Sequence, residues 1–548
     1  MHGSICPLWL LLLVTILACT TPVIGSSAQC TSFTIPHLEG AALLGTTYFK
    51  VNERVNISNL YSAIDTDTLP AFCRVELVIT TNATANSSAL TELWLPDDWN
   101  GRFLAAGQGG LAGGVDVADL GFIAIQQGFA GVSTDTGHSS DADDGTWAGP
   151  GNDNAIIDFG WRALHLSVIT GKEVVKGYYG RSATKAYYIG CSTGGRQGLK
   201  EVQMFPDDFD GVVVGSPANW MSHLMSWSVH ISLNVLPTTS PRFMTPAIWS
   251  DVIHPEVLRQ CDGLDGLQDG IINDPRSCSF RPETLACRPG QNTSTCLTLP
   301  QIHALHRIFA DYFETNQTYI FGPYYPGGET AYPDGLVGAT SFPLPQNWMR
   351  FFVLNDTEWT MDEYNASIPR ICEEVNPGQA DAVNPNITVF VGPSHGGKIL
   401  QYVGWADQLI SPGNSIHYYE SVHAFMQAET GRDIDEFYRL FTVPGMNHCR
   451  APADVFVQDG FGANAFGGAG QAASGMPPIS LDAQHNILAA LVEWVEHEEA
   501  PSTLTAAYYN NNNVTAGVNF TRPLCKFPAS LRFVGGNSND AASFECVT

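Results

Sequence analysis

The stretch YYIGCSTGGRQG (187–198) joins an apolar run, typical of a buried strand, to a glycine-rich segment with the pattern of a helix start. Residues 190–194 match the pattern G-x-S-x-G, with Ser192 at its centre. A strand that turns into a helix at one residue strains that residue, and glycine neighbours prevent clashes. The stretch therefore predicts an exposed, nucleophilic Ser192 hydroxyl at the carboxyl edge of a sheet. The alternative is an ordinary strand-to-helix turn.

Strands and helices are expected to alternate on both sides of this stretch. Short β-rich runs fill residues 75–133, and residues 154–180 have helical spacing that ends at a glycine. Further strands are predicted at 210–217, 398–407 and 437–449, and further helices at 191–206, 415–429 and 482–498. This alternation indicates an α/β fold in which helices cover a mostly parallel sheet. The polar run YYNNNN (508–513) is expected to form a loop.

The alternation stops between about 220 and 394, where tryptophan, proline and clustered cysteines are frequent. We interpret residues 221–394 as an inserted domain. Residues 26–220 and 395–548 would then form one catalytic domain, and residues 1–25 a signal peptide.

A serine hydroxyl becomes a nucleophile only when a base takes its proton. With this type of turn, the chain order of the residues is serine, acid and histidine. Asp407, at the end of a predicted strand, and His448, just after the next strand, satisfy that order. Asp407 would orient the imidazole, and His448 would shuttle the proton. The alternatives are a turn or capping role for Asp407 and a structural role for His448.

The reaction also needs two backbone donors for the oxyanion. The Thr193 N–H, one residue after the nucleophile, is the first candidate. The second is expected in the early loop AAGQGGLAGG (105–114), from Gly109 or Gly110. A merely flexible loop is the alternative there.

The segment CDGLDGLQDGIINDPRSC (261–278) carries three aspartates separated by glycines, Asp262, Asp265 and Asp269. Oxygen-rich loops bent by glycine suit Ca²⁺, although the spacing does not fit an EF-hand. Cys261 and Cys278 flank the loop and could close it as a disulfide. The alternative is a solvated acidic turn.

Several features predict a secreted protein. An apolar run of signal-peptide length begins the chain, ten N-x-[ST] sequons follow, and eleven cysteines lie beyond the signal. A membrane anchor is the alternative for the first segment. A net charge of −28 argues against nucleic acid and anionic membranes as partners. The sequence does not predict the oligomeric state.

The chain resembles the fungal tannase and feruloyl esterase family of α/β-hydrolases, and feruloyl esterase B in particular. The resemblance rests on GRFLAAGQGGLAGG, YYIGCSTGGRQGLKEVQMFPDDFDGVVVGSPA, VLRQCDGLDGLQDGIINDP, GGKILQYVGWADQLISPGNS and DEFYRLFTVPGMNHC. It implies an α/β-hydrolase fold with a large inserted lid, and a Cys191–Cys449 disulfide beside the active site. It also implies a lid calcium site formed by Asp262, Asp265 and Asp269 with the Leu267 and Ile271 carbonyls.

The same resemblance implies four further disulfides and leaves Cys372 unpaired: Cys30–Cys73, Cys261–Cys278, Cys287–Cys296 and Cys525–Cys546. Relatives often have a cysteine where this chain has Gly114, so the loop at 105–114 is expected to be looser here.

The resulting hypothesis is a secreted serine carboxylesterase that cleaves feruloyl or p-coumaroyl esters of plant cell-wall polysaccharide. A tannase that cleaves galloyl esters would use the same three residues. A non-catalytic, calcium-dependent carbohydrate-binding protein on the same scaffold is a third hypothesis. A peptidase has only the shared residues in its favour.

Overall fold

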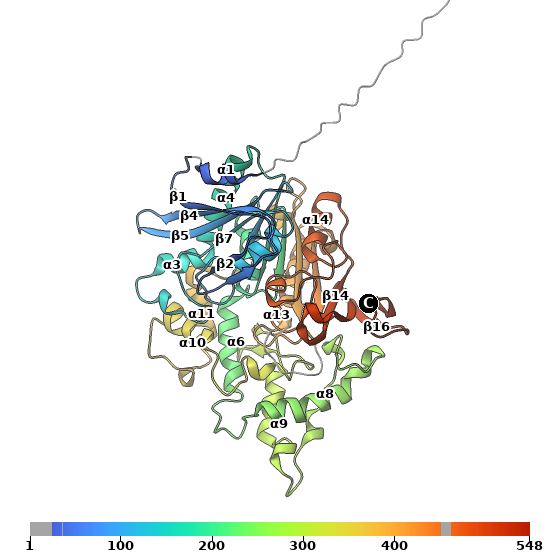
Figure 1. Cartoon of the computed structure of the whole chain (residues 1–548). Helices are drawn as coiled ribbons and strands as arrows, with labels where there is room; N and C mark the ends of the chain where they lie inside the picture. Colours follow the sequence, from blue (N-terminus) through green and yellow to red (C-terminus); the bar gives the residue numbers. More distant parts are fainter. Residues whose placement is uncertain (1–24, 36, 451–461) are drawn as a thin grey trace, which may run out of the picture.

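A computed structural model describes residues 25–35, 37–450 and 462–548, so the expected signal segment lies outside the described residues except for Gly25. Within these ranges a nine-stranded sheet has the order β1-β4-β5-β7-β6-β8-β9-β12-β13 (Figure 1). The strands in that order are Ala41–Phe49, Phe72–Asn82, Ser87–Pro96, Ala130–Thr134, Arg102–Ala106, Lys185–Cys191, Gly211–Gly215, Lys398–Gly404 and Tyr438–Val443. The pairs from β7 to β13 are parallel, and those from β1 to β7 are antiparallel. The prediction of a mostly parallel sheet is therefore confirmed.

Helices cover both faces of the sheet, as the continuous apolar strands require. α4 (Ala163–Tyr179), α5 (Thr193–Met204) and α13 (Pro412–Thr430) pack into the core on one face. α14 (Ile487–His497) packs on the opposite face, against side chains of β8, β9 and β12. All seven residues of β12 are buried. The architecture is an α/β-hydrolase fold.

The residues between β9 and β12 form a region of short helices, although these two strands are neighbours in the sheet. In Figure 1 this region is green to yellow and lies below the sheet. Its main helices are α6 (Met221–Leu233), α8 (His254–Cys261), α9 (Leu299–Ile308) and α11 (Ile368–Val375). Their core includes Trp227, Trp249 and Trp348, and it is continuous with Leu111 and Phe159 from outside the inserted region.

The helix expected over 154–180 is present as one continuous helical run of α3 (Asp153–Ile157), a π-helical turn (Asp158–Arg162) and α4, which ends before Gly180 at φ 69°. Two other local predictions need correction. Residues 75–133 contain not only strands and turns but also α2 (Val117–Asp119) and a π-helical turn (Leu120–Ile125). Part of the polar run at 508–513 is not loop, because Tyr508 and Tyr509 complete β14 (Thr503–Tyr509). Tyr508 stacks on Phe520 of β15 (Val518–Cys525), and Tyr509 is buried, so packing overrides the polar neighbours.

Among the described residues, no helix combines the length and apolar character needed to cross a membrane.

Candidate active site

Ser192 occupies the single residue between β8 and α5, with φ 62° and ψ −123°. This conformation is costly for a residue with a side chain, and the surrounding structure must enforce it. The Ser192 N–H donates to the Gly215 carbonyl at 3.0 Å, which anchors the turn to β9. A Cβ at Gly194 would lie 2.8 Å from the Gln108 carbonyl oxygen, so glycine is needed there. The predicted strained turn at Ser192 is present.

Asp407 and His448 follow neighbouring strands, β12 and β13, and meet at the carboxyl edge of the sheet. The His448 Nδ1 lies 2.8 Å from Asp407 Oδ2. Asp407 Oδ1 accepts the N–H groups of Leu409 and Ile410, both at 2.9 Å, and the Asp407 side chain is fully buried. These three bonds satisfy a buried carboxylate and fix the ring plane of His448.

A disulfide joins Cys191 to Cys449 across 258 sequence positions, with the Cα atoms 5.9 Å apart. It links the residue before Ser192 to the residue after His448. Cys449 itself has a φ of 64°, so the bond falls on two sharply bent segments. The four other expected disulfides are also present, and Cys372 is the one free cysteine in the described part of the chain.

Ser192 and His448 both line a cavity of about 290 Å³ at the carboxyl edge of the sheet. A smaller pocket of about 40 Å³ adjoins it and shares Ser192 and His448. Its wall is mostly apolar and comes from α6, from the start of α10 (Pro343–Asn347) with the preceding Phe342, and from Leu409 and Ile410. In the described structure no hydrogen bond joins the Ser192 hydroxyl to the His448 ring. Such catalytic contacts often tighten only when substrate is bound.

The candidate oxyanion donors are brought together at one side of Ser192. The Thr193 hydroxyl donates to the Gly110 carbonyl at 2.7 Å, which ties the start of α5 to the loop at 105–114. Gly109 and Gly110 both line the cavity. Within the described residues, the N–H groups of Gly109, Gly110 and Thr193 donate to no backbone carbonyl. Gly110 has a φ of 59°, and a Cβ there would lie 2.4 Å from the Ala142 carbonyl oxygen.

The loop at 105–114, expected to be looser because Gly114 is not a cysteine, is held by several contacts of the Leu111 carbonyl. The Leu111 carbonyl accepts hydrogen bonds from the Ser140 hydroxyl at 3.1 Å and the Trp147 indole at 3.0 Å. The His138 Nε2 lies 3.1 Å from the same oxygen, and the His138 ring stacks on Trp147. Burial lowers the pKa of His138 to about 4, so the ring is neutral and its Nε2 donates. These contacts tie the loop at 105–114 to residues 138–147.

The acidic loop predicted to bind calcium folds back on itself. Asp262 Oδ1 accepts the N–H of Gly270 at 3.1 Å, and Asp265 accepts the N–H of Leu267 at 3.0 Å. Asp269 forms an ion pair with Arg522 at 2.7 Å, a partner that the sequence did not suggest. Burial raises the pKa of Asp265 to about 6, and the charges of Asp269 and Asp262 add to the rise.

The donor set of this loop fits a hard cation. Within the described residues, the carbonyls of Leu267 and Ile271 accept no hydrogen bond, although Ile271 is buried. Asp262 and Asp265 line a small hollow next to Asn273 and Asp274. The groups available are therefore carboxylate, amide and carbonyl oxygens, which Ca²⁺ prefers.

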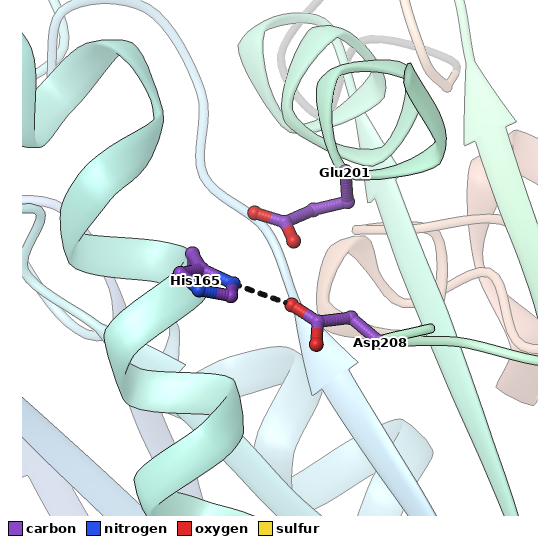
Figure 2. A group of neighbouring side chains, drawn as sticks. All are labelled: His165, Glu201 and Asp208. Carbon is purple, nitrogen blue, oxygen red and sulfur yellow. Dashed lines mark hydrogen bonds and ion pairs between the residues drawn. The ribbon is translucent and has the colours of Figure 1, made fainter. Parts of the chain in front are cut away.

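A second group of titratable side chains, not singled out by the sequence, lies between α4 and α5 (Figure 2). His165 Nδ1 lies 2.7 Å from Asp208 Oδ2, and the buried Glu201 points toward both, with no hydrogen-bond partner for either carboxylate oxygen. Among the described residues, only this group brings three such ligand atoms within 4.8 Å of one another. Burial and the neighbouring Asp208 raise the pKa of Glu201 well above its usual value. Protonation of Glu201, which this raised pKa favours, would relieve the repulsion between the two carboxylates without a metal ion.

Sequence reasoning missed three residues of the cavity wall, Tyr61, Asp116 and Asp119. Tyr61 lies between β2 (Val55–Ser58) and β3 (Ala63–Thr66), and the two aspartates border the short α2 (Val117–Asp119). No motif contains them, because only the folded chain places them beside Ser192.

Known proteins match nearly the whole chain. A family model described as Tannase and feruloyl esterase matches residues 73–547. A probable feruloyl esterase B-1 of Aspergillus flavus is 37% identical over 477 residues, covering 87% of this chain and 86% of that protein. A probable feruloyl esterase B-1 of Aspergillus oryzae is 36% identical and covers 95% of this chain and 94% of that protein.

Solved structures match as well. The crystal structure of feruloyl esterase B from Aspergillus oryzae superposes with a TM-score of 0.85 at 36% identity, covering 95% of this chain and 99% of that one. A tannin acyl hydrolase from Aspergillus niger superposes with a TM-score of 0.72 at 23% identity, covering 96% and 95% of the two chains, which supports the shared fold.

Proposed function

The chain belongs to the tannase and feruloyl esterase family, and on that premise we propose that it is a secreted serine esterase of hydroxycinnamoyl esters in plant cell-wall polysaccharide. That it is a carboxylic ester hydrolase follows from its feruloyl esterase relatives and structural match. The non-catalytic carbohydrate-binding hypothesis is therefore not retained. The main support for the mechanism is the hydrogen bond between Asp407 and His448, together with the strained Ser192, which lines the same cavity as His448.

In the proposed reaction, His448 Nε2 takes the proton of Ser192 Oγ as this oxygen attacks the ester carbonyl carbon. Asp407 keeps Nδ1 protonated and stabilises the imidazolium that forms. The Thr193 N–H and the N–H of Gly109 or Gly110 stabilise the oxyanion. His448 then protonates the leaving alcohol, and the acyl group remains on Ser192 until water, activated by the same histidine, releases the acid.

The feruloyl preference is proposed over the galloyl one for two reasons. Relatives at 36–37% identity are described as feruloyl esterases, whereas the tannin acyl hydrolase is only 23% identical. The small pocket beside Ser192 is also lined by Met221, Leu224 and Met225, which suit a methoxylated ring better than three hydroxyl groups. Turnover of methyl ferulate against methyl gallate tests the choice, and a strong preference for gallate would favour the tannase hypothesis.

We also propose that the loop at 262–271 binds a structural Ca²⁺ ion. Asp262, Asp265 and Asp269 would supply carboxylate oxygens, and Leu267 and Ile271 their carbonyls. Opposite ligands of Ca²⁺ are about 5 Å apart, so the carboxylates need not all touch one another. The ion would brace the inserted region and takes no part in the ester chemistry.

Secretion and glycosylation complete the proposal. Five disulfides suit an oxidising compartment. Of the ten sequon asparagines, all except the half-buried Asn82 are exposed. Asn82 donates to Asn154 at 3.1 Å and is the one least available to a glycan.

A further inference from the structure

The cavity at Ser192 has two walls of different chemistry. The small pocket under α6 is apolar, with Met221, Leu224 and Met225 as its main side chains. The larger part shares the apolar residues Phe342, Leu344 and Leu409 with that pocket. On the side of β2, β3 and α2, however, it presents Tyr61, Asp116, Asp119 and Arg450. Ser192 and His448 lie on the boundary and belong to both. An ester whose carbonyl reaches Ser192 would therefore place its two halves in different surroundings.

The two aspartates of the larger part are fixed by backbone and hydroxyl donors but have spare acceptor capacity. Asp116 Oδ1 accepts the Asp119 N–H at 3.1 Å and the Ser62 hydroxyl at 3.0 Å. Both oxygens of Asp119 share one donor, the Gly470 N–H, at 3.1 Å each. The exposed fractions of Asp116 and Asp119 are only 7% and 2%. Because a carboxylate can accept about four hydrogen bonds, several sites remain for donors that enter from the cavity.

An aromatic ring and a cation complete this wall. The Tyr61 side chain is half-buried and lies against Gly109, where an added Cβ would be 3.3 Å from the Tyr61 hydroxyl oxygen. The exposed Arg450 lies at the rim and donates to the Gly470 carbonyl at 3.3 Å. Paired carboxylates beside an aromatic face suit a ring that carries vicinal hydroxyl groups and apolar C–H faces.

We propose that Tyr61, Asp116 and Asp119 form the binding site for the sugar half of the ester. This inference rests on the proposed function and adds the alcohol specificity to it. Vicinal hydroxyls would donate to Asp116 and Asp119, and Tyr61 would cover one face of the sugar ring. The aromatic acyl group would then point toward the apolar pocket, whose lining contains no carboxylate for the ring to desolvate.

The charge of the pair is compatible with a neutral sugar. Burial and the nearby Asp116 raise the pKa of Asp119 well above its usual value, while Arg450 opposes the rise. A raised pKa reduces the charge that must be covered when a neutral substrate binds, and a carboxyl that takes up a proton could donate to a sugar oxygen. The vicinal hydroxyls of a galloyl ring could also donate to these carboxylates, so the experiment must distinguish a sugar from a galloyl group as the ligand.

The test compares turnover of 5-O-feruloyl-arabinose, methyl ferulate and methyl gallate by wild type, Asp116→Asn and Tyr61→Ala. Both substitutions should lower the ratio of kcat/KM for feruloyl-arabinose to that for methyl ferulate by about tenfold or more. Asp153→Asn, an equal charge change on the exposed surface of α3, is the matched control and should leave the ratio unchanged. A melting curve for each variant identifies those that are folded.

An unchanged ratio in the folded variants would overturn the proposal, and so would a loss confined to methyl gallate. Calorimetric binding of feruloyl-arabinose to Ser192→Ala, with and without Asp116→Asn, tests the site without turnover. If wild type hydrolysed no feruloyl ester while Ser192→Ala still bound the sugar ester through Asp116, the proposed function would fail and the sugar site would stand. Equal binding with and without Asp116→Asn would overturn the sugar site.

Discussion

Cys191 is bonded to Cys449, so the neighbours of Ser192 and His448 are held with Cα atoms 5.9 Å apart although 258 positions separate them. Constraining a loop of this length stabilises the fold by about 5 kcal/mol in the chain-entropy model. The bond also fixes the relative position of two residues that must exchange a proton. Small displacements at such a pair are costly in rate.

Removal of this disulfide should therefore reduce turnover per folded molecule, in addition to reducing stability. For Cys191→Ala/Cys449→Ala we expect kcat/KM for methyl ferulate to fall at least about tenfold at a temperature where the variant is folded. Cys287→Ala/Cys296→Ala removes a disulfide of the inserted region and is the control. Equal turnover per folded molecule in both double variants would contradict the positioning role.

Asp407→Asn should keep the fold and lose most of the activity. Asparagine retains the shape of the buried side chain but no longer holds the protonated Nδ1 of His448. We expect kcat to fall roughly ten-thousand-fold with little change in KM. Steady-state kinetics and a melting curve measure the two effects, and a loss of less than tenfold would exclude Asp407 as the orienting acid.

Glu201 should make the stability of the protein depend on pH. Burial and Asp208 raise the pKa of Glu201 in the folded state, and the positive charge of Lys172 partly opposes this rise. His165 is the other titratable group at the site. Between pH 4.5, the ordinary pKa of a glutamate, and the higher pKa of Glu201 in the folded state, only the unfolded chain releases the proton. In this pH range Glu201 therefore lowers the free energy of unfolding as pH rises. Glu201→Gln removes the effect.

The free energy of unfolding of Glu201→Gln, relative to wild type, should therefore increase as pH rises above about 4.5. Urea unfolding at several pH values measures the difference. Glu429→Gln, at an exposed position on α13, is the control. A difference between Glu201→Gln and wild type that does not vary with pH would show that Glu201 is not held protonated.

Calcium removal should destabilise the protein. With EGTA we expect the melting temperature to fall by roughly 2 °C or more and to recover when Ca²⁺ is added back, but not with Mg²⁺. In Asp265→Asn the shift should disappear. A melting temperature that is insensitive to EGTA in the wild type would favour a solvated acidic turn at 262–271.

The sequence predicted best those parts of the site that depend on local patterns. The turn at Ser192 could be predicted because an apolar strand, a G-x-S-x-G pattern and a helix start occur together within a short span. The strand ends at Asp407 and His448 followed from the same alternation. The first edge strand, β1, was missed because its sequence AALLGTTYF does not alternate apolar with polar residues, and the apolar Leu44 is exposed.

Features that depend on long-range packing could not be predicted. The Arg522 partner of Asp269 lies 253 positions away, and the wall formed by Tyr61, Asp116 and Asp119 exists only after β2, β3 and α2 fold against the loop at 105–114. The His165, Glu201 and Asp208 group joins two helices and the segment that follows them. No spacing rule relates such residues, because the packing of separate elements determines their distances.

The central claim is that Ser192 is the nucleophile, and covalent labelling tests it most directly. Diisopropyl fluorophosphate reacts with an activated serine by forming a P–O bond and releasing fluoride. Intact-mass and peptide analysis should find one label on the peptide that contains Ser192, with activity lost in proportion, and no label in Ser192→Ala. Loss of wild-type activity with the label on another residue, or full labelling of Ser192→Ala, would contradict the account.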